Sequence, residues 1–484
     1  MKRAISLIAL LATSCATMEP QYSRPSPAIP ASWPVGEPYL AQAEVGLPVL
    51  TYREVFQDQR LQTLIAQALV NNRDLMVAAA NVAAAREQYR IQRANQLPTV
   101  TAGAGATVKG TKDDVSANYS VDLSVPNFEL DLFGRVRSLT HVQQQRYFAT
   151  EAGARATRLT LVAAIASAWL DHAADSSLRA IAEQTAASAE KSVRLTRARL
   201  EGGVAPRTDL RQAEQILSSA QADLARQRTA VAQDVNALQL LVGTPIDPKL
   251  LSGSIDEAFG RIVPVPAGLD SYVLLRRPDV VQAEYQLRAA NAQIGAARAA
   301  LFPRITLTGL LGLASTALGN LFTGGAFAWS AGADGTYTIF QAGAGKANVR
   351  LSQAQRDAAV AGYQQAIQTA FREVSDALAR RGTINDEIAA RQRQQVATAD
   401  TYNLTEARYR AGIDPFLTVL DAQRSYYSAQ QTMVQTKLTA AQNIVSLYQA
   451  IGGDASLEST PICQSLPGDN SASSAKLASQ CSPM

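Results

Sequence analysis

The chain has 484 residues, with 45 Lys and Arg against 41 Asp and Glu, so its formal net charge is only +4. That balance excludes the strongly basic surface typical of nucleic-acid-binding proteins. Aromatic residues make up only 6% of the chain, and Ala and Gln dominate its long periodic stretches, which favours long helices packed through small residues over a thick globular core.

The first residues have the order of a secretory signal. Met1-Lys2-Arg3 precedes an apolar run and then Thr13-Ser14-Cys15, which is charged, apolar and small in turn. A signal that ends in Cys resembles a bacterial lipobox, so Cys15 is predicted to be acylated after removal of residues 1–14. An ordinary cleaved signal with a chance Cys is the alternative. Ala16 follows instead of Asp, which implies sorting to the outer membrane.

A helix is predicted over residues 60–97, because Pro98 cannot continue it. Two segments with a period of two come next, at 100–109 and 119–125, where apolar residues alternate with small or polar ones. Each segment is roughly ten residues long, the length of a tilted strand that crosses a bilayer.

Helical composition then continues without Pro from residue 135 to about 200. At 1.5 Å per residue such a helix would be about 100 Å long, which is too long for a compact domain. A turn at 202–206 is predicted to reverse the chain into a return helix over 208–243.

The same order of elements then occurs a second time. Residues 198–206 return as 407–415 at an offset of 209, and Gly243 falls on Gly452 at that offset. The duplication predicts repeat one at 59–256 and repeat two at 257–455, after a lipid-anchored segment at 15–58 and before a tail at 456–484. In repeat two we expect helices at 270–301, 346–410 and 416–451 and strands at 305–312 and 327–334.

Aromatic residues lie near the ends of the predicted strands and favour a membrane sheet over a soluble sheet with one wet face. They are Tyr119, Phe128, Phe302, Phe322, Phe327, Trp329 and Tyr337. Four strands cannot close a membrane barrel, since the smallest known barrels need about eight. The chain is therefore expected to oligomerise, with eight strands from two copies or twelve from three.

Both return helices carry a heptad seam of mainly apolar residues. The polar exceptions fall at equivalent places, Gln227 and Asp234 in repeat one and Thr436 and Asn443 in repeat two, which predicts similar coiled-coil surroundings for the two helices. The opposite face of each is polar, as expected for the wall of a helical tube or for a solvated hairpin.

Catalytic signatures are missing from the sequence. The only histidines, His141 and His172, have no cluster of metal-ligand spacing around them. Residues 343–346 resemble a phosphate loop, but Ala347 stands where Ser or Thr is required. We therefore predict no enzyme, no metal and no cofactor. Cys463 and Cys481 could pair in an oxidising compartment, without a predicted functional role.

Several motifs in order resemble one known family, the TolC-type outer-membrane factors, and in particular their lipoprotein branch. The motifs are Cys15 with Pro20, Tyr22, Arg24-Pro25 and Trp33-Pro34; Phe128 to Arg135; Arg276-Arg277-Pro278-Asp279 with Ala289-Ala290-Asn291-Ala292; Ile294 to Arg298 with Phe302-Pro303; and Tyr409 to Gly412 with Leu420 to Arg424.

The resemblance implies a mainly α chain of two tandem α-β repeats whose homotrimer forms a twelve-stranded membrane barrel and a twelve-helix periplasmic α-barrel. It implies a passive outer-membrane channel of a tripartite efflux system, supplied by a periplasmic adaptor (membrane fusion) protein and an inner-membrane resistance-nodulation-division pump. Outer-membrane lipid is the other implied partner, and nucleic acid is not one.

The resemblance also implies site residues. Leu417, Asp421 and Arg424 match the rings that shut the periplasmic end in this family, and Asp209 lies where some relatives carry an acidic residue. Three Asp side chains around a narrow axis would hold cations or pair with Arg, whereas the alternative is an exposed i,i+3 pair. The turns match the adaptor-contacting tips through Gly203, Val204, Pro206, Gly412, Ile413 and Pro415.

Two other functions remain open for this sequence. The same fold can serve as the outer-membrane conduit of a type I protein-secretion system. A lipid-anchored periplasmic coiled-coil scaffold would also account for the long helices, but it would leave the predicted strands exposed to water.

Overall fold

The computed structural model describes residues 17–27, 29–30, 32–39, 51–112, 115–265 and 271–453. Cys15, Cys463 and Cys481 lie outside these residues. The described chain forms two compact units. Unit 1 takes residues up to 27 together with 80–152 and 281–366, and unit 2 takes 28–79, 153–280 and residues from 367 onward.

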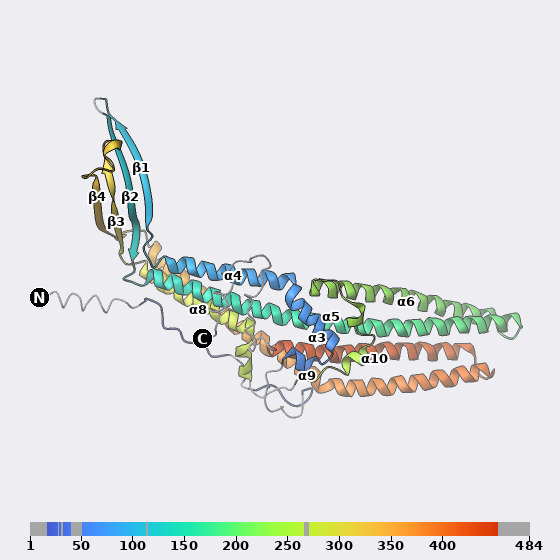
Figure 1. The fold of residues 1–484 in the computed structure, drawn as a ribbon. Coiled ribbons are helices and arrows are strands. Elements are labelled where there is room, and N and C mark those ends of the chain that lie inside the picture. The colour runs from blue at the N-terminus through green and yellow to red at the C-terminus, as the bar shows by residue number, and fades with distance from the viewer. Residues whose placement is uncertain are drawn as a thin grey trace. The chain divides into compact units, whose positions relative to one another are not determined.

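Unit 1 contains a four-stranded antiparallel sheet in the order β1-β2-β3-β4 (Figure 1). The strands are β1 (Thr101–Gly110), β2 (Val115–Leu130), β3 (Arg304–Ser315) and β4 (Phe327–Thr336). All four predicted strands are present, but β2 is longer than expected. The alternation predicted only its part before Pro126, whereas pairing with β3 resumes at Phe128 after an irregularity, as at a β-bulge.

The pairing register sorts the side chains onto two faces. Leu123 of β2 lies between Ala102 and Leu311, and Leu311 pairs with Trp329, so one face carries an apolar row. Adjacent positions carry Gly103, Asp122 and Gly312 on the other face. This alternation is the pattern of a strand with lipid on one side and a polar interior on the other.

The helices of unit 1 hold the N-terminal segment 17–24. A Cβ on Gly295, in helix α8 (Pro278–Ala299), would lie 2.9 Å from Glu19 Cα, so only glycine allows this approach. The Asn291 side chain donates to the carbonyl of Pro20 at 2.8 Å. Arg24 donates to both oxygens of the buried Glu284, at 3.1 and 2.6 Å.

Unit 2 contains most of two helical hairpins, whose long helices begin in unit 1 (Figure 1). One joins α5 (Arg135–Glu201) to α6 (Arg207–Val242), and the other joins α9 (Ala344–Arg410) to α10 (Phe416–Ala450). These bounds agree with the predicted long and return helices to within two residues. The short elements are α2 (Tyr52–Val55), η1 (Pro248–Leu250), α7 (Ile255–Phe259) and η2 (Ser271–Arg276), with η3 (Leu318–Asn320) in unit 1.

The single helix predicted over residues 60–97 was wrong. The structure has α3 (Gln59–Asn71) and α4 (Arg73–Ala94), separated at Asn72, whose backbone is extended with ψ 132°. The Asn72 side chain accepts from the Leu75 N–H at 2.9 Å and donates to the Leu241 carbonyl at 2.8 Å. It thus caps the second helix, a role that hydrophobic periodicity does not reveal.

In the described part of the chain, no helix has the length and apolar character that spanning a membrane requires.

Candidate gate and adaptor-contact site

The two hairpin turns have the same backbone. The N–H groups of Gly203 and Val204 donate to the carbonyls of Leu200 and Arg199 at 3.0 and 2.9 Å, and Gly412 and Ile413 repeat both bonds at the offset of 209. This is the Schellman arrangement. It needs a left-handed residue, and Gly203 and Gly412 have φ of 75° and 77°. Pro206 and Pro415 then precede the return helices. Proline has no backbone N–H, but at the start of a helix that group would have no partner within the helix.

The predicted tip residues therefore lie together within each turn. Val204 and Ile413 are both exposed at the turns, so each tip presents one aliphatic side chain to solvent.

The charged groups at the two tips differ. Arg408 donates to both oxygens of Asp414, at 2.7 and 3.0 Å, within the second tip. The Arg408 guanidinium lowers the pKa of the Asp414 carboxyl. Repeat one has Arg199 at the equivalent position but Ala205 instead of the carboxylate.

Arg199 contacts the other hairpin instead. Its Nη1 donates to the Tyr409 carbonyl at 3.2 Å, and its guanidinium lies 4.7 Å from the centre of the Tyr409 ring. Sequence reasoning missed this link between the hairpins. The lack of a carboxylate partner for Arg199 at offset 209 was the available signal.

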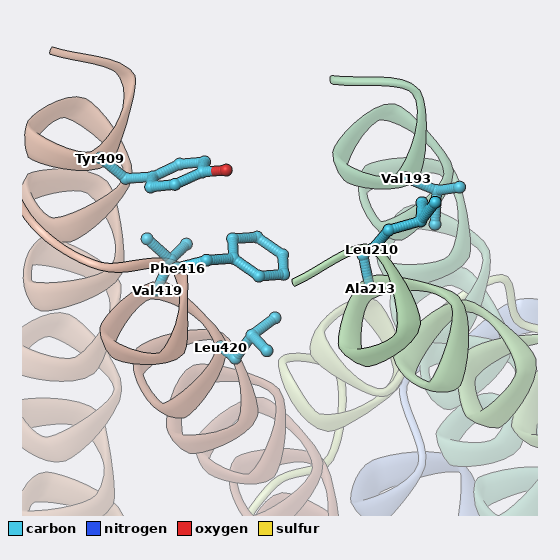
Figure 2. Packing of buried hydrophobic residues seen from close by; sticks show 7 residues of the cluster. All are labelled: Val193, Leu210, Ala213, Tyr409, Phe416, Val419 and Leu420. Carbon is cyan, nitrogen blue, oxygen red and sulfur yellow. The ribbon is translucent and has the colours of Figure 1, made fainter. Parts of the chain in front are cut away.

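An apolar cluster joins the hairpins just behind the tips. Figure 2 shows Phe416 and Leu420 of α10 pointing toward Leu210 of α6. The buried members are Val193, Leu210, Ala213, Tyr409, Phe416, Val419 and Leu420. More hydrogen bonds follow along the helices, from Tyr427 to Asp223 at 3.4 Å and between Ser188 and Tyr402 at 3.1 Å.

Leu417, Asp421 and Arg424 all lie on one exposed face of α10. The seam residues Val419 and Ala422 are buried on the opposite side, so the predicted division into a packed and a wet face is present in the structure. Arg424 Nη1 and Asp421 Oδ1 are 3.9 Å apart with both side chains more than half exposed. Such an exposed i,i+3 pair contributes little stability, so both side chains are free to meet other groups.

Asp209 occupies the first turn of α6, in the other hairpin. Its carboxylate favourably complements the positive end of that helix. In the described part of the chain, no hydrogen bond or ion pair joins Asp209 to Leu417, Asp421 or Arg424.

A cluster of acidic side chains, which the sequence analysis did not identify, lies farther along the repeat-one hairpin. Burial, followed by the charges of Asp175 and Asp171, raises the pKa of Asp234 to about 7. The pKa values of Asp171 and Asp175 are raised as well, first by burial. Gln442 donates to Asp171 at 2.7 Å. Within the described residues, no three His, Cys, Asp or Glu side chains are arranged to hold a metal ion.

Most of the chain matches known proteins. The family model described as "Outer membrane efflux protein" matches residues 64–244 and 270–453. The chain belongs to this family. It is similar to the antibiotic efflux pump outer membrane protein ArpC and the toluene efflux pump outer membrane protein TtgC, both of Pseudomonas putida. With each it shares 42% identity over 463 residues, covering 93% of this chain and 94% of the relative.

Among solved structures, the open state of the MtrE outer membrane channel of Neisseria gonorrhoeae matches with a TM-score of 0.83 and 36% identity. The match covers 90% of this chain and 98% of that one. This outer membrane efflux protein is therefore a channel of an efflux pump in the outer membrane, and its family transports rather than catalyses. Three chains of four strands each make its twelve-stranded barrel, as predicted.

Proposed function

We propose that this channel is the exit of a tripartite system in which a resistance-nodulation-division pump and a periplasmic adaptor protein deliver small toxic molecules to it. Membership of an efflux family supports the pump, and the two rigid tips with exposed Val204 and Ile413 support the adaptor. The pump provides the energy, and the channel conducts passively.

The cargo is proposed to include antibiotics and aromatic solvents. Two relatives with 42% identity are named for antibiotic and toluene efflux. Deleting the gene should lower both the minimal inhibitory concentrations of several antibiotics and survival in toluene. If the deletion strain keeps its antibiotic resistance and toluene survival but no longer secretes a protein, the channel would instead serve type I secretion.

The periplasmic gate is assigned to Leu417, Asp421 and Arg424. The observation that carries this assignment is their common exposed face on α10, opposite the buried seam. In three copies, this face would bring like carboxylates together, where guanidinium groups or cations would hold them. Asp209 is assigned as an additional acidic residue near the gate entrance.

Single-channel conductance in planar bilayers tests the gate. Asp421→Ala and Arg424→Ala should each raise conductance, because each removes one partner of the closing contacts. The matched controls are Gln212→Ala and Gln215→Ala, at the equivalent positions of repeat one, and these should leave conductance unchanged. If Asp421→Ala and Arg424→Ala conduct no more than the two controls, the gate assignment is wrong.

The adaptor contact is assigned to the two turns, at Gly203, Val204, Pro206, Gly412, Ile413 and Pro415. Val204→Asp with Ile413→Asp should abolish drug efflux in cells, while the conductance of the purified channel remains normal. Efflux at the wild-type level would show that the tips are only helix reversals.

Lipid anchoring is proposed at Cys15. Growth with radioactive palmitate should label the wild-type protein and not Cys15→Ser. Label that persists in the variant would assign the anchor elsewhere, and an unlabelled wild type would indicate an ordinary cleaved signal.

A further inference from the structure

Unit 1 has a hollow of about 260 Å³ where the strands meet the helices. One wall is the segment 337–341, which follows β4, and another is the end of β2. The lining combines aromatic and charged side chains, among them Glu129, Phe133, Phe302, Arg304, Tyr337 and Gln341. The stacked rings of Phe133 and Phe302, 4.7 Å apart, give it a rigid apolar patch.

The hollow lies beside an edge of the sheet. In the described chain, β1 and β4 each pair on one side only, and an unpaired edge in a membrane must be completed by another strand. In a closed ring the neighbouring copy's β1 would run antiparallel to β4, because the four strands of each copy alternate in direction.

The pairing within one copy determines how far the strands are staggered. Thr101 pairs with Ser124, Ser124 with Leu310 and Leu310 with Ser330. Ser330 is six residues before Thr336, the last residue of β4. A closed barrel needs its strands tilted and therefore a stagger around the ring, and an even shift keeps the two faces in phase.

We infer that Thr101 of the neighbouring copy lies opposite Thr336 and that residues 97–100 of that copy cover the hollow. This register pairs the ten residues of β1 with all ten of β4 and supplies a shift of six residues per copy. In this register, the residues before Thr101 of the neighbouring copy lie alongside the residues after Thr336. The latter residues form one wall of the hollow.

Exposure of apolar side chains supports the same contact. Leu97 is 70% exposed in the single copy, and Val100 is almost as exposed. Tyr337, Ile339 and Phe340, on the other side of the proposed contact, are exposed as well. Bringing the two segments together removes both apolar groups from solvent. The inference depends on closure by three copies and is independent of the cargo, the adaptor and the gate.

Disulfide cross-linking tests the register in the full-length trimer, with Cys463 and Cys481 replaced by Ser. Thr101→Cys with Thr336→Cys should give covalent dimers and trimers on non-reducing gels after oxidation, because opposed residues have Cβ atoms about 5 Å apart. The matched control, Thr101→Cys with Ser330→Cys, represents a barrel without stagger and should remain monomeric on the gel. Cross-linking only in the control, or in neither pair, would overturn the proposed register.

Thiol accessibility tests the occupant of the hollow. Leu97→Cys in the trimer should react roughly tenfold more slowly with a water-soluble maleimide than Val115→Cys, since a covered thiol is inaccessible. Val115 is 69% exposed in the single copy. It is the first residue of β2 and pairs with Gly110 at the far end of β1, so it matches Leu97 in exposure but lies away from the hollow. Equal rates in the trimer would show that the hollow is not covered by this segment.

Discussion

The turn of the α5–α6 hairpin and that of the α9–α10 hairpin share a backbone but differ in what surrounds them. Both end on a Schellman turn with glycine in the left-handed region. In the second, Arg408 is held by Asp414 of the same turn, whereas Arg199 of the first reaches Tyr409 across the hairpins. The two repeats thus have the same turn backbone but different side-chain contacts. The arginine of the second turn forms an ion pair within that turn, and the arginine of the first turn binds the other hairpin.

Burial shows the same asymmetry. Phe416 is 3% exposed at the start of α10 and belongs to the apolar cluster, but its equivalent at offset 209 is the exposed Arg207. Tyr409 is buried, while its equivalent Leu200 is only half-buried. Repeat two therefore supplies most of the large side chains that hold the hairpins together near the tips.

Of the substitutions that test this asymmetry, Phe416→Ala should cause the largest loss of local stability. Removing a buried Phe typically costs about 3 kcal/mol or more, which corresponds to on the order of a 100-fold loss of amide protection around residues 409–420. Hydrogen exchange of the trimer followed by mass spectrometry would measure it. Arg207→Ala is the matched control and should leave protection at 200–211 nearly unchanged. Similar losses in both variants would show that the hairpins support each other symmetrically.

The acidic cluster predicts a second asymmetry, in pH dependence. The folded chain keeps the Asp234 proton up to a pKa of about 7, whereas the ordinary value is 3.8. The stability that this proton provides is complete below pH 3.8, falls as pH rises to about 7, and is absent above it. Asp234→Asn, which copies Asn443 of repeat two, should remove that fall.

Melting temperatures of the trimer between pH 4 and 8 would check this prediction. The variant minus wild-type difference should grow by roughly 1–3 °C up to pH 7 and then stay level. Taking the difference largely cancels the contribution of His172, whose pKa is lowered by burial and by Arg179. Asn443→Asp is the control, because in repeat two Arg380 and Ile384 stand at the positions equivalent to Asp171 and Asp175. An aspartate at 443 therefore lacks the two acidic neighbours of Asp234. Parallel curves for wild type and Asp234→Asn would contradict the raised pKa of Asp234.

The sequence predicts the elements better than their contacts. The period-two pattern located the strands, and helical composition without Pro located the long helices, because both are local properties of the sequence. Gly203 and Gly412 marked turns that need glycine. The break at Asn72 and the Arg199–Tyr409 link depend on side chains distant in sequence. The proposed gate residues could be placed on a wet face, but a single chain does not bring Leu417, Asp421 and Arg424 to their counterparts in other copies.

The smallest predicted effect concerns the tip charges. Ala205→Asp supplies repeat one with the carboxylate that Asp414 provides in repeat two, so Arg199 should leave Tyr409 and pair within its own turn. A cation–π contact contributes at least about 0.5–1 kcal/mol, so protection around Tyr409 should fall at least about two- to fivefold in hydrogen exchange. Asp414→Ala disturbs only the ion pair within the second turn and should leave the Arg199 contact in place. If Ala205→Asp changes nothing, Arg199 does not join the hairpins, and the apolar cluster and the hydrogen bonds farther along the helices hold them.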